Sequence, residues 1–289
     1  MVPPFIYGKA PGFRVVRWNK VRRENRRIRG NHVKVIKHLL GDFDEIEILP
    51  LADLHIGDVH ADGKKINEWL TYIREKDNCF TILNGDLMNT ATRTGISDIY
   101  SETGSPMDML EQCVKLFGPI KDKILAVTGG NHERRIWKDS GIDTVALMCE
   151  QLDIGDRYSP GQAMVFVSFG KQSPHKNYQP VLYTILCVHG NGGGKKEGAK
   201  LQRLVDLADI ADADIFLHSH THLPLIARNA YYRVDKRRFA VIKVDRLYVN
   251  TSSSIEYGGY GEIQAFRPNS LETPKIILSG RERKMQAIL

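Results

Sequence analysis

The sequence predicts an α/β fold in which most strands run parallel. From residue 45 onward, short apolar runs of strand length alternate with segments of helical periodicity. Polar residues that can bind a metal ion follow several of these runs directly, as Asp53, Asp86 and His189 do. The composition, 42% hydrophobic and 26% charged over 289 residues, is that of an ordinary globular protein with a sizeable core.

The first elements follow from the spacing of apolar residues. Residues 45–53 contain Ile46, Ile48 and Leu51 in an extended apolar pattern, which predicts a strand ending at Asp53. Residues 64–76 carry their apolar side chains at helical spacing, which predicts a helix. The later strands are expected at 79–83, 124–128, 163–169, 181–188, 215–217, 239–244, 247–250 and 274–278, and the later helices at 106–117, 141–152 and 195–211. Residues 171–180 and 191–198 are rich in loop-forming residues and are expected to be loops.

The charge is concentrated at the N-terminus. The chain carries +7 in total, but residues 1–40 hold eleven Lys and Arg against Glu24 alone, so they carry +10 and the remainder carries −3. We therefore divide the chain into a basic N-terminal arm, 1–40, and one domain, 41–289. Such an arm indicates a polyanionic partner such as nucleic acid, although a solvated basic segment without a partner has the same composition.

Several classes of protein are disfavoured. No uncharged apolar run reaches the roughly 18 residues of a membrane span. No secretory signal is visible at the N-terminus, so a cytoplasmic protein without membrane contact is expected. The four cysteines are scattered without a Cys-x-x-Cys pair, which favours buried reduced thiols over disulfides or zinc sites.

Metal-capable side chains lie just after five of the predicted strands or strand-like runs. The carboxyl ends of parallel strands meet at one edge of a sheet, so these side chains are expected to converge. Carboxylate, imidazole and amide donors suit Mn²⁺, Fe or Zn²⁺. Two such cations about 3.5–4 Å apart can clamp a phosphate and supply a hydroxide that attacks phosphorus in line. The clusters are Asp53-Leu54-His55, Gly85-Asp86-Leu87-Met88-Asn89, Gly130-Asn131-His132-Glu133, His189-Gly190 and His220-Thr221-His222.

In this order the five clusters resemble the calcineurin-like metallophosphoesterases, over roughly residues 45–225. The resemblance implies two β-sheets packed face to face with helices outside, a four-layer α/β/β/α sandwich. It also implies two divalent metal ions, with Mn²⁺ favoured, and a bridging role for Asp86. It places His132 at the phosphate and the leaving oxygen as a proton donor, oriented by Asn89 where many relatives have Asp or His. The implied ligands are Asp53, His55 and His222 for one metal, and Asn131, His189 and His220 for the other.

Four basic side chains are candidates for binding the substrate phosphate. Arg134 and Arg135 follow the Gly-Asn-His-Glu cluster, Arg93 follows the Gly-Asp-x-x-Asn cluster, and Lys195 lies in a glycine-rich loop. Ion pairs with nearby carboxylates are the alternative for the three arginines. A flexible connector is the alternative for the loop.

The resemblance favours a phosphodiesterase or nuclease. The Gly-Asp-x-x-Asp-Arg-Gly of the Ser/Thr protein phosphatases is here Gly85-Asp86-Leu87-Met88-Asn89-Thr90-Ala91, without the second Asp and the Arg. The closing His-x-His looks like the nuclease and phosphodiesterase branches. Together with the basic arm, this predicts cleavage of DNA or another nucleic acid. The alternatives are a phosphatase or phosphodiesterase of a small or cyclic nucleotide, and a non-catalytic binding subunit. A homodimer is suggested by analogy only.

Overall fold

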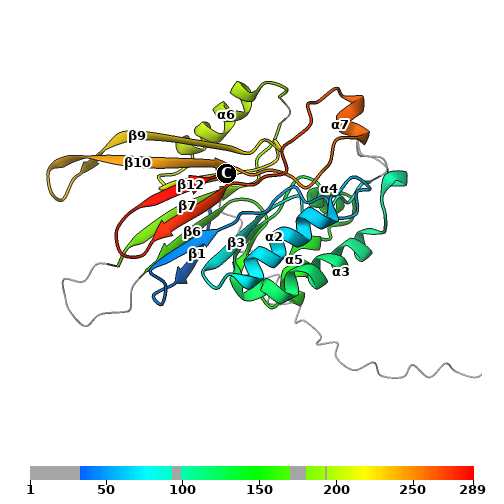
Figure 1. The fold of residues 1–289 in the computed structure, drawn as a ribbon, viewed down its shortest axis with the longest axis horizontal. Coiled ribbons are helices and arrows are strands. Elements are labelled where there is room, and N and C mark those ends of the chain that lie inside the picture. The colour runs from blue at the N-terminus through cyan, green and yellow to red at the C-terminus, as the bar shows by residue number, and fades with distance from the viewer. Residues whose placement is uncertain (1–32, 93–98, 170–179, 193) are drawn as a thin grey trace, which may run out of the picture. The chain divides into compact units, whose positions relative to one another are not determined.

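Two mixed six-stranded β-sheets form the centre of the protein (Figure 1). The computed structural model describes residues 33–92, 99–169, 180–192 and 194–289. Almost all of the predicted basic arm, residues 1–32, therefore lies outside the described residues, whereas residues 34–39 form a strand. The four-layer arrangement expected from the sequence is confirmed.

The first sheet has the strand order β1-β6-β7-β8-β10-β9. Parallel pairing joins β1 to β6, β7 to β8 and β8 to β10, and the other neighbours are antiparallel. The strands are β1 (Lys34–Leu39), β6 (Ala163–Ser168), β7 (Leu182–Val188), β8 (Ile215–His218), β9 (Leu225–Asp235) and β10 (Ala240–Asn250).

The second sheet has the order β12-β11-β2-β3-β4-β5. Its four strands from β2 to β5 are parallel, and β11 and β12 are antiparallel additions. The strands are β2 (Glu45–Ile48), β3 (Cys79–Asn84), β4 (Ile124–Thr128), β5 (Tyr158–Ser159), β11 (Lys275–Ser279) and β12 (Met285–Ile288).

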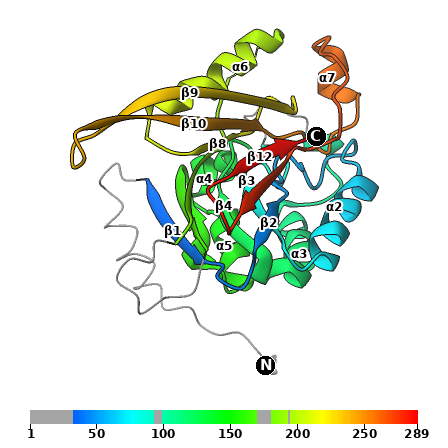
Figure 2. The same ribbon diagram turned by 60° about the vertical axis from the view of Figure 1, so that its left-hand side comes forward.

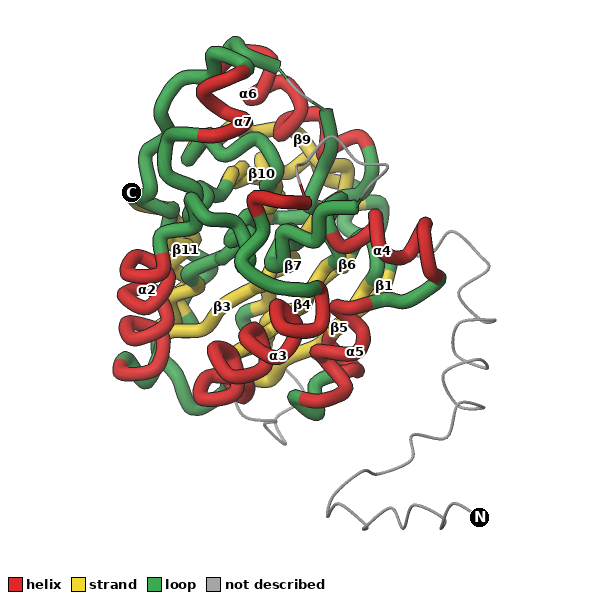
Figure 3. The backbone as a smooth tube through the Cα atoms, turned by 90° about the vertical axis from the view of Figure 1, so that its right-hand side faces the viewer, coloured by secondary structure: helices red, strands yellow, loops and turns green. Residues whose placement is uncertain are grey.

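Helices cover the outer faces of both sheets. On the second sheet lie α2 (Gly63–Glu75), α3 (Pro106–Phe117) and α5 (Thr144–Gln151), as Figure 3 shows. The helix α6 (Glu197–Asp206) packs on β8 and β10 of the first sheet. Two short helices, α4 (Glu133–Ser140) and α7 (Gly259–Ile263), lie in connecting segments. Short 3-10 helices lie at Ile99–Ser101, Gly118–Lys123, Gly155–Arg157 and Leu207–Asp209.

The layers are held by two apolar cores. One lies between the sheets and includes Ile48, Val165 and Leu217, all fully buried. The other lies between the second sheet and its helices, and it includes Trp69 of α2, Leu83 of β3 and Met109 of α3. The central strands β3 and β4 of the second sheet are buried on both faces, and for this reason they are mostly apolar runs rather than alternating ones.

Local sequence signals explain where the main helices begin. The Asp62 side chain accepts hydrogen bonds from the backbone N–H of Lys64 and Lys65 and so caps α2. Ser105 and Asp108 form a reciprocal capping box at α3, with Pro106 in the first turn. The boundaries predicted for these two helices agree with the structure within two residues.

Other elements differ from the prediction. The two strands expected at 239–244 and 247–250 are one continuous strand, β10, and its long partner β9 was missed together with β1, β12 and α4. Polar and charged residues interrupt β9 and β1, because both strands lie at sheet edges where one or both faces are exposed. Within the described parts of the chain, no helix has the length and apolarity needed to cross a membrane.

Candidate dinuclear metal centre

The predicted ligands lie at one edge of the two sheets, in the loops that follow β2, β3, β4, β7 and β8. Main-chain hydrogen bonds continue past the strands: Asp53 N–H donates to Gly85 O at 3.0 Å, and His55 N–H to Asp86 O at 3.0 Å. On the other sheet, Ser219 N–H donates to His189 O at 3.1 Å. The ligand loops are therefore extensions of the sheet ladders.

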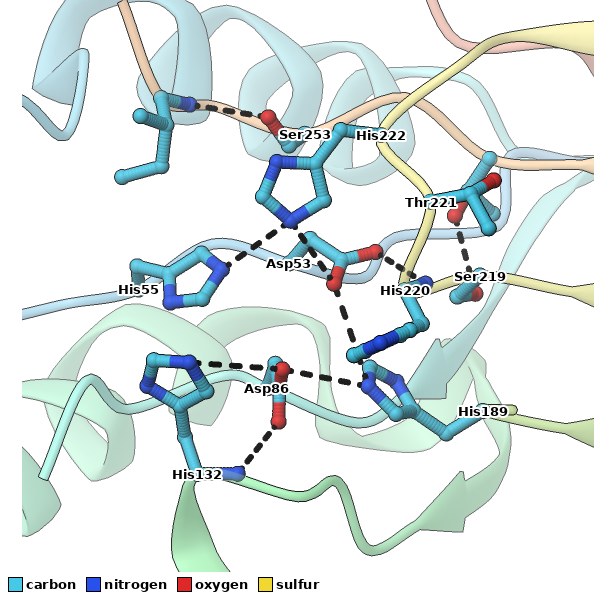
Figure 4. Close-up of polar contacts among 12 residues, drawn as sticks. Asp53, His55, Asp86, His132, His189, Ser219, His220, Thr221, His222 and Ser253 are labelled. Atoms are coloured by element: carbon cyan, nitrogen blue, oxygen red, sulfur yellow. Dashed lines mark hydrogen bonds and ion pairs between the residues drawn. The ribbon is translucent and has the colours of Figure 1, made fainter. Parts of the chain in front are cut away.

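The side chains converge on two neighbouring groups (Figure 4). In the first group, His222 Nε2 lies 3.3 Å from Asp53 Oδ1 and 3.3 Å from His55 Nε2. In the second group, His189 Nε2 lies 3.2 Å from Asp86 Oδ2 and 4.0 Å from Asp53 Oδ1. His220 belongs to the second group, within 4.8 Å of the other donor atoms.

Asn131 lies beside the second group. Its Oδ1 is 3.1 Å from His189 Nε2, so its amide oxygen points to the same place as the imidazole. The structure thus brings together all seven residues that the sequence analysis names as ligands.

The hydrogen bonds and burial of the donor atoms suit the binding of cations. His55 Nδ1 donates to Asn89 Oδ1 at 3.2 Å, and His189 Nδ1 donates to the Asn84 carbonyl at 2.7 Å. In the neutral form of each ring the proton is on Nδ1, so Nε2 would offer a lone pair to a bound cation. Among the described residues, Asp53 Oδ1 and His220 Nδ1 are buried without a hydrogen-bond partner. Buried polar atoms left without partners are costly, and a bound cation would satisfy Asp53 Oδ1. The residues present therefore fit a metal centre.

The two carboxylates are held in the charged form. Burial by itself would raise the pKa of Asp86, but the surrounding imidazoles, His189 foremost, keep this pKa well below the ordinary value. Burial likewise opposes the charge of Asp53, and His222 and His189 lower its pKa in the same way. Burial would lower the pKa of His189, whereas Asp86 raises it to about 10. Without a cation, the protonated His189 ring therefore balances part of the negative charge of Asp53 and Asp86 at the point where the ligand groups meet.

Glu133 fixes the turn that carries Asp86, a role that the sequence analysis did not foresee. Its buried carboxylate accepts four main-chain N–H groups: those of Asp86 at 3.2 Å and Gly130 at 3.1 Å through Oε2, and those of Leu87 at 2.6 Å and Met88 at 3.0 Å through Oε1. Burial, and then the charge of Asp86, raise the pKa of Glu133 to about 7. The Glu of Gly-Asn-His-Glu therefore acts on the main chain and not on the substrate.

His132 lies next to the ligand groups. Its Nδ1 donates to the Asn89 carbonyl at 2.7 Å, and its Nε2 accepts from the Arg135 guanidinium at 3.0 Å. Its Nε2 is 3.9 Å from Asp86 Oδ2. Burial, and then His55, lower the pKa of His132 to about 3, so the ring is neutral near pH 7. Asn89 orients this ring as the sequence analysis expects, but through its main-chain oxygen, while its side chain contacts His55.

A carboxylate from a distant segment supports this loop. Glu102 accepts a hydrogen bond from Ala91 N–H and pairs with the Asn89 side chain. Burial raises the pKa of Glu102, and the nearby charge of Asp58 raises it further. Glu102 lies thirteen positions after Asn89. No local motif connects the two, so this contact was not visible in the sequence.

The four candidate substrate-binding residues are placed differently. Arg135 is half-buried beside His132. Arg134 is exposed, and no contact of its side chain with the ligand groups is found within the described residues. Lys195 donates to the Gln264 carbonyl at 2.7 Å and lies 5.5 Å from the Phe266 ring, which ties its loop to the segment after α7. Arg93 lies outside the described residues.

The loop with the last two histidines is anchored by residues of β10. His218 Nδ1 donates to Asn250 Oδ1 at 2.6 Å, and the Asn250 amide donates to Thr221 Oγ1 at 3.0 Å. His220 N–H donates to Asp53 Oδ2 at 2.9 Å. His218 is thus a structural residue.

Comparison with known proteins agrees with this geometry. The family model described as calcineurin-like phosphoesterase matches residues 54–251, more than half of the chain. No curated protein matches the chain.

Three solved structures that are similar to the chain have low sequence identity to it. A Streptococcus pneumoniae protein described as a predicted phosphoesterase is 14% identical, with 85% of this chain and 98% of that chain covered and a TM-score of 0.34. A Sphaerobacter thermophilus metallophosphoesterase is 12% identical, with 84% and 87% covered and a TM-score of 0.38. The Pseudomonas putida nuclease MPE is 14% identical, with 83% and 87% covered and a TM-score of 0.32. With TM-scores below 0.5, these similarities say nothing about substrate.

Proposed function

Since the chain belongs to the calcineurin-like phosphoesterase family, we propose that it is a dinuclear metal-dependent phosphodiesterase that cleaves nucleic acid. The observation that carries the proposal is the pair of adjoining donor groups that share Asp53. One group is Asp53, His55 and His222, and the other is Asp53, Asp86, His189 and His220.

The chain's own residues would hold two cations in these groups. Asp86 lies in the second group and also in a third with His55 and His132, which supports the role that the family resemblance implies for it, a ligand that both cations would share. When bound, two divalent cations supply Lewis-acid activation of a phosphate and of water. Imidazole and carboxylate donors suit Mn²⁺, Fe and Zn²⁺, and we favour Mn²⁺.

His132 donates a proton to the leaving oxygen. The Asn89 carbonyl can only accept, so Nδ1 keeps its proton and Nε2 is the atom available for transfer. Nε2 is unprotonated near pH 7 and must take up a proton before it can donate one to the departing alkoxide. A substrate phosphate beside the ring would favour this protonated form, because a nearby negative charge raises the pKa of an imidazole.

Arg135 contributes positive charge at the same position. Its guanidinium already lies 3.0 Å from His132 Nε2. A phosphate oxygen that replaced this contact would gain a charge-assisted hydrogen bond and would free the imidazole for proton transfer. Among the candidate phosphate-binding residues that the structure describes, Arg135 is therefore the one nearest to His132.

Nucleic acid is the favoured substrate because of the charge distribution. Residues 1–40 carry +10 against −3 for the rest of the chain. Contacts between Lys or Arg and phosphates supply most of the affinity for a polynucleotide. A small nucleotide would not need a long basic segment.

The test is Mn²⁺-dependent cleavage of end-labelled single- and double-stranded DNA, with Asp86→Asn as control. Cleavage by the parent that is lost in the variant supports the proposal and reveals the polarity. If the parent hydrolyses bis(p-nitrophenyl) phosphate but leaves both DNAs intact, the substrate is instead a small nucleotide. If it hydrolyses nothing with any divalent metal, the chain is a binding protein and the enzymatic proposal is wrong.

A further inference from the structure

The hairpin of β9 and β10 projects beyond its sheet. The two strands pair along their whole length, from Leu225↔Asn250 to Asp235↔Ala240. The other neighbour of β10, β8, pairs only with Leu247–Asn250. Residues 240–246 therefore pair with β9 alone, and Figures 1 and 2 show the two-stranded ribbon extending away from the body. From this ribbon we infer a second nucleic-acid contact, a binding arm for duplex DNA, which rests on the proposed function.

The ribbon carries more positive charge than its own contacts use. Residues 228–246 contain seven Lys and Arg against two Asp, a net +5 in a domain that is otherwise acidic. Four arginines have partners: Arg228 pairs with Asp245, Arg238 with Asp235, and both Arg233 and Arg246 with Asp212. No ion pair involves the exposed cations Lys236, Arg237 and Lys243 within the described residues.

Two aromatic side chains stand beside these cations. Phe239 is 96% exposed and Tyr232 is 74% exposed. Phe239 also has a positive φ of 50°, a conformation that favours Gly or Asn over Phe. Asp235 Oδ1 accepts the N–H of Arg237 and Arg238, so the turn is already ordered without any contribution from the Phe239 ring. An exposed Phe in this conformation does not stabilise the fold, which indicates that it serves a partner.

Shape and charge together favour duplex DNA as that partner. The major groove of B-DNA admits a two-stranded β-ribbon, whereas the major groove of A-form RNA is too narrow. Lys236, Arg237 and Lys243 can contact phosphates on the groove walls, and Tyr232 and Phe239 offer apolar contacts to base edges.

The ribbon is joined directly to the metal centre. β9 begins three positions after His222, and β10 ends at Asn250, which holds His218 and Thr221. Ten residue steps along β9 at about 3.4 Å each place the tip roughly 34 Å from this base, the length of about ten base pairs. The ribbon therefore binds duplex that flanks the cleaved phosphate, and not the cleaved phosphate itself.

The test measures binding of labelled DNA in EDTA, where no cleavage occurs. The variant is Lys236→Ala, Arg237→Ala, Lys243→Ala, and the control removes the same charge from exposed lysines elsewhere, as Lys64→Ala, Lys115→Ala, Lys138→Ala. For a duplex of about 30 base pairs, the negative slope of log K against log salt should be smaller in magnitude by about 2.7 in the ribbon variant, because three phosphate contacts are lost. The slope of the control variant should equal that of the parent. A duplex of about 8 base pairs and an RNA duplex should bind parent and variant alike. Hydrolysis of bis(p-nitrophenyl) phosphate should be unchanged.

A second variant, Phe239→Gly, guards against a folding defect. Its melting temperature should be equal to or above that of the parent, because Gly suits the left-handed turn, while its affinity for the long duplex should fall. If both variants bind the long duplex as the parent does, the proposal that the ribbon binds duplex DNA is wrong. If the variants change the oligomeric state while the affinity for DNA stays the same, the proposal is also wrong, and the ribbon instead contacts a second copy of the chain. If the parent itself binds no DNA yet hydrolyses the small diester, the nucleic-acid part of the proposed function fails first.

Discussion

Replacing Glu133 by Gln tests whether one carboxylate holds the Asp86 turn. The two side chains have nearly the same shape, but Gln replaces one acceptor oxygen by an NH₂ group. Each Glu133 oxygen accepts two main-chain N–H groups, so either orientation of Gln leaves two buried N–H groups facing a donor.

The expected loss follows from these contacts. A buried donor without a partner costs about 1–3 kcal/mol, so two of them should lower the free energy of unfolding by about 2–6 kcal/mol. That is a large part of the 5–15 kcal/mol typical of a whole domain. The experiment belongs at pH 8, above the Glu133 pKa of about 7, so that the carboxylate is ionised and accepts all four bonds. The raised pKa also means that burying this charge costs stability at pH 8, and Gln relieves that cost, so the measured loss should lie at the lower end of the range.

Urea denaturation of metal-free protein measures this loss without a contribution from metal binding. The matched control is Glu111→Gln, an exposed residue of α3, which should change stability by less than about 0.5 kcal/mol. Equal stability of Glu133→Gln and the control would refute the assignment of Glu133 as the clamp of this turn.

Four further outcomes are expected. Asp86→Asn should abolish turnover and reduce the metal content measured by mass spectrometry; full activity would exclude the two-metal centre. His132→Ala should keep both metals while kcat falls by about 10²–10⁴, and a loss of metal would instead make His132 a ligand. Glu102→Gln should slow only substrates with poor leaving groups, because it loosens the loop that orients His132; an equal slowing of p-nitrophenyl esters would contradict this. Deleting residues 1–30 should flatten the salt dependence of DNA binding, and an unchanged slope would show that the basic arm makes no phosphate contact.

The sequence was a good guide to the ligands because their positions depend on strand ends. Asp53, Asp86 and His189 each follow an apolar run, and the runs are buried strands because of their composition. Once parallel pairing is assumed, the meeting of these residues at one edge follows from topology.

The supporting contacts could not be predicted in this way. Glu102, Asn84 and Asn250 act on the site through main-chain or side-chain bonds to residues distant in sequence. Neither the residue type nor the adjacent sequence indicates these contacts, since an Asn or Glu at the end of a strand or helix is common. The β9–β10 hairpin was missed in part because its exposed Arg, Lys and Tyr break the apolar pattern that marks a buried strand.

The left-handed backbone conformation of the ligand residues is a further feature that could not be predicted from the sequence. Asp53, His55, Asp86, His220 and His222 all have positive φ, between 45° and 65°. A left-handed non-glycine residue costs about 1–2 kcal/mol, so the five together cost roughly 5–10 kcal/mol. Asp and His adopt this conformation more often than most residues but far less often than Gly, so their presence alone does not predict it. It persists because the ladder bonds of the ligand loops and the Glu133 carboxylate over-determine the main chain. The strain turns the side chains inward, which explains why donor atoms from five separate loops meet within a few ångströms.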